Sequence, residues 1–155
     1  MHATTTPLQY LSFTLGGLEY GIDIATVQEL CVLKALERIA SQGAIIGGVA
    51  VSRGVIMPLV DMRAACGTGA KTSDPRPDVI IVRLAGGVVG LVVDGVTGVV
   101  TLEPGQVTPL PGIEGVQANY LIGLGQVGPR RLVLVDIGRL MSVEGSATRA
   151  VKQVA

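Results

Sequence analysis

The sequence predicts a mainly β protein made of two small, similar halves. Hydrophobic residues make up 48% of the 155 residues but aromatic residues only 3%, so the core must consist of Val, Ile and Leu, which favour strands. The 22 glycines separate short apolar runs as turns separate strands. The order of these runs and turns also occurs twice along the chain.

The first half is expected to contain two β-hairpins. Two alternating runs meet at Gly16-Gly17, and two apolar runs meet at Ser52-Arg53-Gly54. The four strands of these hairpins are 9–15, 20–24, 45–51 and 55–60. Between the hairpins, residues 27–33 fit either a strand or a helix, and residues 34–44 are expected to form a loop.

The second half follows a linker at 67–78 that is rich in Gly, Ser, Asp and Pro. Its expected strands are 79–84, 88–93, 96–102, 120–124 and 132–135. A long loop containing three prolines lies between the third and fourth of them. Asp61 and Asp136 each occupy the N-cap position of a short helix, and the two helices are expected at 62–66 and 137–141.

The two halves match as an internal repeat. The residues 17–30 correspond to 86–99, which lie 69 positions later, and Leu59-Val60-Asp61 recurs as Leu134-Val135-Asp136, 75 positions later. A chance match is the alternative, because Gly and Val are common in this chain. If the repeat is real, each half has about 65 residues and buries too little surface to be comfortably stable alone. We therefore expect the halves to share a hydrophobic core.

The residues that carry most enzyme chemistry are missing. The only histidine is His2, so neither Cys31 nor Cys66 has a catalytic partner or a metal-binding set, and we expect free thiols. Gly123 to Gly128 matches the dinucleotide fingerprint, but a proline and a strand follow where a helix is needed, which favours a hairpin turn. Asp94 is interpreted as a turn residue and not as one of a catalytic aspartate pair, because the repeat places no second aspartate at the matching position. We expect no enzyme, no metal and no other cofactor.

The remaining class is an interaction module, and two charged residues stand out in it. Arg53 is a lone cation in a predicted turn between two apolar strands, and Glu29 stands among apolar neighbours. Each is either a solvated surface residue or an anchor of an interface. The formal net charge of zero disfavours nucleic acid as the partner.

Four segments, taken together, closely resemble the bacterial chemotaxis coupling proteins of the CheW family. They are YLSFTLGGLEYGIDIATVQEL, IIGGVAVSRGVIMPLVDMR, VVGLVVDGVTGVV and ANYLIGLGQV…LVLVDIGRLM, and the resemblance extends from about Gln9 to Ser142. It implies two small SH3-like five-stranded β-barrels that share a core, with short helices. It also implies a non-enzymatic adaptor that joins the cytoplasmic tips of chemoreceptors to the histidine kinase CheA.

The resemblance implies a domain at 9–143, with subdomains at roughly 9–70 and 78–143 that can exchange elements. Residues 1–8 and 144–155 are then a flexible N-terminal tail and a C-terminal tail. Expected partners are the receptor tips, the regulatory domain of CheA and other CheW copies in array rings. The expected location is the cytoplasm at the inner face of the membrane, without direct insertion into it or binding to nucleic acid.

The matching positions give candidate site residues. Arg53 falls on the arginine of the family's Asn-Leu-Arg-Gly motif, and the resemblance implies receptor binding by Arg53, Val27, Glu29, Gly48 and Gly54. Val79 matches a position implied in contact with the kinase.

The chain also departs from the family pattern. Val51-Ser52 replaces the usual Asn-Leu, and a proline usual near Gln42-Gly43 is missing. These departures leave the receptor class open. Two alternatives therefore stand: a related pathway for surface motility or another output, and a self-associating structural β protein.

Overall fold

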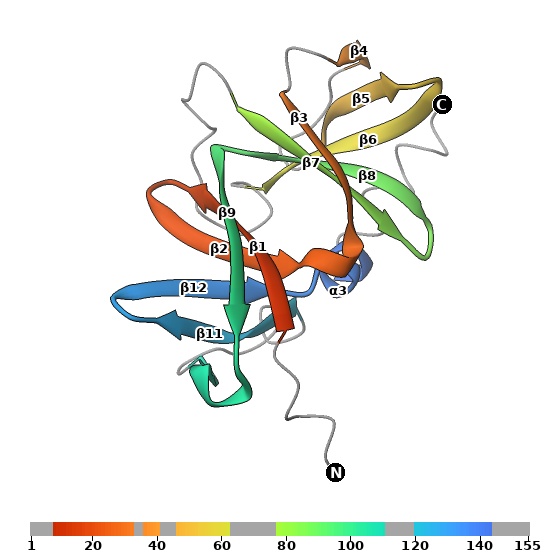
Figure 1. Ribbon diagram of the computed structural model, residues 1–155. Coiled ribbons are helices and arrows are strands. Elements are labelled where there is room, and N and C mark those ends of the chain that lie inside the picture. Colours follow the sequence, from red (N-terminus) through yellow and green to blue (C-terminus); the bar gives the residue numbers. More distant parts are fainter. Residues whose placement is uncertain (1–7, 33–35, 41–45, 63–76, 111–119, 144–155) are drawn as a thin grey trace.

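The computed structural model of the chain describes residues 8–32, 36–40, 46–62, 77–110 and 120–143 (Figure 1). The predicted tails lie outside this part of the chain, except for Leu8, which begins the first strand. Most of the helix predicted at 62–66 and of the linker predicted at 67–78 also lies outside it.

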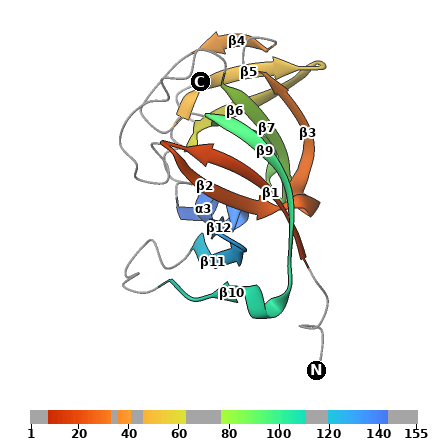
Figure 2. The same ribbon diagram turned by 60° about the vertical axis from the view of Figure 1, so that its left-hand side comes forward.

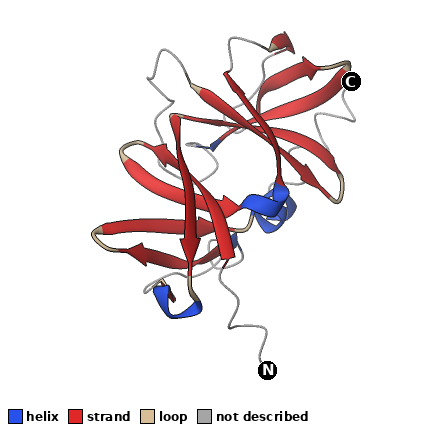
Figure 3. Cartoon of the chain, in the orientation of Figure 1, coloured by secondary structure: helices blue, strands red, loops and turns tan. Residues whose placement is uncertain are grey.

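The described residues form strands with a few short helices (Figure 3). The strands of the first half are β1 (Leu8–Leu15), β2 (Leu18–Asp23), β3 (Val27–Val32), β4 (Glu37–Ala40), β5 (Ile46–Ser52) and β6 (Val55–Asp61). Those of the second half are β7 (Asp78–Leu84), β8 (Gly87–Val93), β9 (Gly95–Leu102), β10 (Val107–Thr108), β11 (Leu121–Val127) and β12 (Arg130–Val135). The helices are η2 (Ile24–Thr26), η4 (Pro104–Gln106) and α3 (Ile137–Val143).

Each of the two sheets takes one hairpin from the other half of the chain. The first sheet has the order β10-β11-β12-β2-β1-β9, and the second sheet has the order β3-β7-β8-β6-β5-β4. The β1–β2 hairpin therefore lies among strands of the second half, and the β7–β8 hairpin among strands of the first (Figures 1 and 2). When the second order is read from its other end, the two orders correspond strand for strand, so that β12 matches β6 and β2 matches β8. The two exchanged hairpins therefore occupy equivalent places.

The sequence repeat is also a structural repeat. In the first sheet β12 runs parallel to β2, with Leu134 opposite Gly21. In the second sheet β6 runs parallel to β8, with Leu59 opposite Gly90. The offsets of 69 and 75 positions found in the sequence relate these two pairs to each other. The repeat is confirmed, and the alternative of a chance match is wrong.

Three clusters of buried side chains hold the sheets. One belongs to the first sheet, one to the second, and the largest joins the two. The exchanged hairpins contribute to more than one cluster, because strand residues point alternately to opposite faces. Along β7, Val79 and Ile81 belong to the cluster of the second sheet, whereas Ile80 and Val82 belong to the shared cluster.

The mainly β class is confirmed, with three refinements. Residues 27–32 form a strand, which settles the ambiguity between strand and helix. The loop predicted at 34–44 was wrong in part, because β4 forms there through pairing of Glu37 and Arg38 with Val51 and Ala50 of β5. Each sheet has six strands where the resemblance implied five, because the short β4 and β10 extend the edges.

Two local motifs follow the sequence prediction. Asp136 caps α3, because its Oδ1 accepts a hydrogen bond of 3.0 Å from the backbone N–H of Arg139. The run from Gly123 to Gly128 ends in the turn between β11 and β12, where Gly128 has a φ of 56°. It is a hairpin turn and opens no helix.

Gly21 and Gly90 permit the parallel pairing that joins the two halves. A Cβ at Gly90 would lie 2.8 Å from Leu59 Cδ2 and 3.3 Å from Met57 Cε, both in the core. A Cβ at Gly21 would lie 3.1 Å from Leu134 Cδ2. The same close approach therefore occurs at both crossings between the halves.

We expect Gly90→Ala to lower the free energy of unfolding by about 1–3 kcal/mol, the usual cost of overpacking a core. Gly21→Ala should cost less, because its closest contact is longer. Urea unfolding followed by circular dichroism measures both. The matched control is Gly86→Ala, where the added methyl meets nothing within 4 Å. Equal stability of the Gly90 and Gly86 variants would contradict this explanation.

Candidate interaction surface

Arg53 lies at the tip of the β5–β6 hairpin. Ser52 pairs with Val55, so Arg53 and Gly54 form a two-residue turn. Their φ angles are 54° and 79°, and positive φ at both positions is the mark of a type I′ turn. Among the described residues, Arg53 is the only non-glycine residue with a positive φ. This conformation is one that Asn and Gly adopt more easily than Arg.

The side chain of Arg53 forms an ion pair with Glu29 of β3. Nε lies 3.6 Å from Oε1, and the two side chains are 81% and 27% exposed. In the order of the second sheet, β3 is an edge strand and three strands separate it from β5. The contact therefore shows that the sheet curls until its edge strand meets the hairpin tip. An ion pair this exposed adds little stability.

Two exposed apolar residues follow Arg53 in the chain. Val55 and Ile56 follow the turn directly and are 49% and 67% exposed. We call Glu29, Arg53, Gly54, Val55 and Ile56 the tip surface. Exposed aliphatic groups beside an arginine are typical of a protein-binding surface. Sequence reasoning identified 55–60 as an apolar strand but did not single out Val55 and Ile56, because the uniformly apolar run does not show which of its residues are exposed.

The other predicted site residues have different places. Val27 is half-buried against the shared core, and Gly48 is buried with a φ of 132°, which favours glycine. Val79 is fully buried inside the second sheet, so its side chain offers no surface to a partner. We therefore correct its assignment from a kinase contact to a core residue.

The equivalent end of the first sheet differs. The repeat places Gly98 and Gly128 at the positions of Glu29 and Arg53, so this end cannot form the same ion pair. Instead Arg130 donates two hydrogen bonds to Glu19, of 3.1 and 2.6 Å. Thr97 Oγ1 donates to Glu19 Oε2 at 3.0 Å and lies 2.6 Å from the Oγ of the buried Ser12.

This network pairs the charge of Glu19 with that of Arg130 at the end of the first sheet. Residues 19, 97 and 130 correspond through the repeat to Val88, Gln28 and Val55 of the second sheet, so that end is more apolar. The two similar sheets therefore present different surfaces. Sequence reasoning missed the network because Glu19, Thr97 and Arg130 are far apart in the chain.

The hydrogen bonds from Arg130 hold the pKa of Glu19 below its ordinary value, with Thr97 adding to the effect and burial opposing it. A lowered folded-state pKa means that the stabilisation is fully present above the pKa of an unfolded glutamate, 4.5. It is lost as the pH falls through the lower folded-state value.

We expect Glu19→Gln to be less stable than the unmodified chain by about 1 kcal/mol or less at neutral pH. The difference in melting temperature should stay constant above about pH 6 and shrink as the pH falls below 4.5. Thermal unfolding between pH 3 and 8 measures it. A difference that does not change with pH would show that the network contributes no ionic stabilisation.

The described part of the chain holds no group of three or more residues that could bind a metal ion. Cys31 is a free, half-buried thiol whose pKa is raised by burial and then by the charges of Glu29 and Asp78. Cys66 lies outside the described residues. No helix in the described ranges is long and apolar enough to cross a membrane.

Comparisons with known proteins agree with this geometry. The family model of the CheW-like domain matches residues 9–145. The chain is 42% identical to a chemotaxis protein CheW of Klebsiella aerogenes over 144 residues, which cover 92% of this chain and 87% of the relative. It is 26% identical to a chemotaxis protein CheW of Rhizobium meliloti, with 92% and 93% covered.

A solved structure extends the agreement to the fold. The crystal structure of the scaffolding protein TtCheW from Thermoanaerobacter tengcongensis superimposes with a TM-score of 0.77 at 25% identity, covering 90% of this chain and 96% of that one. That structure has two SH3-like subdomains, which confirms the predicted fold class. With the family model matching most of its length, the chain belongs to the CheW family.

Proposed function

We propose that this chain is a non-enzymatic adaptor that couples chemoreceptors to the histidine kinase CheA in chemotaxis. Membership of the CheW family and the likeness to a solved scaffolding protein support the adaptor role. The observation that supports a specific mechanism is the tip surface, where two exposed apolar residues follow the arginine of an exposed ion pair. Such a surface binds through apolar contact and sets the register through charge.

The proposed receptor contact is made by Arg53 and the apolar residues beside it. The side chain of Arg53 is 81% exposed and only loosely held at 3.6 Å from Glu29, so it is available to a second carboxylate. Ile56, the more exposed of the two apolar residues at 67%, would rest on the apolar face of a receptor helix. Gly54 permits the turn, and Val27 and Gly48 support the strands from behind.

The proposed contact with CheA uses a surface away from the tip surface, because an adaptor must bind both partners at once. A change in the receptor can alter the kinase only if the joined complex favours one kinase state. Other copies of the chain would occupy the same arrays. The chain would lie in the cytoplasm, held at the inner face of the membrane by receptors.

We expect the unmodified chain to pellet with receptor-containing membranes and to carry additional CheA with it. Arg53→Glu should weaken this pelleting about tenfold or more, because it reverses the charge at the centre of the contact. The matched control is Arg131→Glu, an exposed arginine on β12 of the first sheet. Co-sedimentation with each variant measures the effect.

If the chain binds neither receptor nor CheA, the proposed function is wrong. Equal losses for the Arg53 and Arg131 variants would remove the tip surface from the proposal. Strong self-association of the chain alone by size exclusion would favour the structural alternative.

We expect Arg53→Asn to separate binding from stability. Asn tolerates a positive φ better than Arg, so the melting temperature should stay the same or rise slightly. Receptor binding should still fall, because the guanidinium is gone. Thermal unfolding and co-sedimentation of one preparation measure both effects. A marked loss of stability would instead make Arg53 a structural residue.

A further inference from the structure

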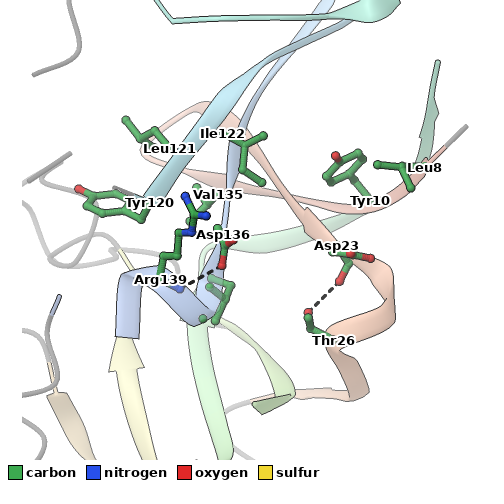
Figure 4. A pocket seen from close by; sticks show the side chains of 12 residues that line it. Leu8, Tyr10, Asp23, Thr26, Tyr120, Leu121, Ile122, Val135, Asp136 and Arg139 are labelled. Atoms are coloured by element: carbon green, nitrogen blue, oxygen red, sulfur yellow. Dashed lines mark hydrogen bonds and ion pairs between the residues drawn. The ribbon is translucent and has the colours of Figure 1, made fainter. Parts of the chain in front are cut away.

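A concave surface lies at the other end of the first sheet, away from the β11–β12 turn. It is a pocket of about 570 Å³ formed where the starts of β1, β11 and α3 meet the end of β2 (Figure 4). Figure 4 shows Tyr10 between Leu8 and Ile122. Leu8 and Ile122 are 54% and 47% exposed and form its apolar walls.

Tyr10 supplies a polar group that the described protein does not use. Its side chain is 5% exposed and lines the pocket. The ring is buried, but the hydroxyl opens into the pocket, where it makes no hydrogen bond with any residue in the described ranges. Burial and the charge of Asp23 raise its pKa, so the hydroxyl stays protonated and can donate.

The pocket carries net negative charge. Asp23 and Asp136 contribute two carboxylates and Arg139 one guanidinium, which leaves one negative charge. Arg139 lies 3.7 Å from Asp136 and offsets that carboxylate. Asp23 accepts a hydrogen bond of 2.9 Å from the backbone N–H of Ala25 and forms no ion pair with a described residue.

We propose that this pocket is a docking site for a short segment of a partner protein that inserts an aliphatic side chain between Leu8 and Ile122 and places a lysine or arginine beside Asp23. The Tyr10 hydroxyl would donate to a backbone carbonyl of that segment. The inference does not depend on the receptor role of the tip surface, because the two sites share no residue.

The exposed walls favour a protein segment over a small molecule. Sites for small molecules enclose most of the ligand surface. Here Leu8 and Ile122 remain about half exposed, so a bound molecule would leave them partly uncovered unless it extended beyond the pocket. A peptide backbone that passes over the rim covers both walls at once.

The test uses three acetylated and amidated hexapeptides as probes: Gly-Ser-Leu-Lys-Ser-Gly, the same peptide with Glu for Lys, and the same peptide with Ala for Leu. Nuclear magnetic resonance follows the methyl groups of Leu8 and Ile122 during each titration. The methyl of Ile56, on the tip surface, is the internal control.

We expect the first peptide to shift the Leu8 and Ile122 methyls saturably and to leave Ile56 unchanged. The Glu and Ala peptides should each bind at least about fivefold more weakly. Asp23→Asn should remove the preference for Lys over Glu, because the amide keeps the hydrogen bond to Ala25 but lacks the charge. Tyr10→Phe should weaken all three peptides by a similar factor.

Absence of a saturable shift at Leu8 and Ile122 in the unmodified chain would overturn the proposal. So would equal affinity for the Lys and Glu peptides, or a Lys preference that persists in Asp23→Asn. The titrations of the unmodified chain decide the matter even if a variant fails to fold. Receptor pelleting is measured separately, so its failure leaves this result unaffected.

Discussion

The fold depends on the reciprocal exchange of two hairpins between its halves. Each sheet is completed by a hairpin from the other half, and the parallel pairs β12–β2 and β6–β8 are the connections. The exchanged strands are buried on both faces, so neither half can keep its core without the other. Gly21 and Gly90 favour the connections, because the leucines opposite them lie so close that an added Cβ would be crowded at Gly21 and would force a shift at Gly90. The shared core follows from this topology.

Duplication of the fold leaves the two ends free to differ. In the first sheet, Arg130 and Glu19 satisfy each other and Thr97 completes the network, whereas the neighbouring Arg131 is exposed. In the second sheet, Arg53 and Glu29 form a looser ion pair at 3.6 Å, and the nearby Val55 and Ile56 are exposed. In the proposed function, this is the end that binds a partner protein. Because the two ends differ, two partner proteins can bind the duplicated scaffold at different surfaces, as the proposed adaptor role requires.

Local patterns could predict the strands, the turns and the cap by Asp136, because neighbouring residues determine them. The repeat predicted the shared core. The exchange of hairpins was not predictable in detail, because pairing between distant strands leaves no local pattern. For the same reason β4 was missed, because only pairing with β5 creates it. The kinase contact of Val79 was implied by the family resemblance, whereas the structure buries its side chain in the core. The pocket at Tyr10 is lined by residues of six elements, β1, β2, η2, β11, β12 and α3, and no sequence spacing indicates it.

If the exchanged hairpins bind both sheets into one cooperative unit, the two sheets must open together. Native-state hydrogen exchange in increasing urea measures this directly, with β5 and β6 reporting on the second sheet and β11 and β12 on the first. The slowest amides of both sheets are predicted to share one opening free energy and one dependence on urea. If one sheet opened at a lower free energy than the other, and its opening depended less steeply on urea, the shared core would not be the basis of the fold.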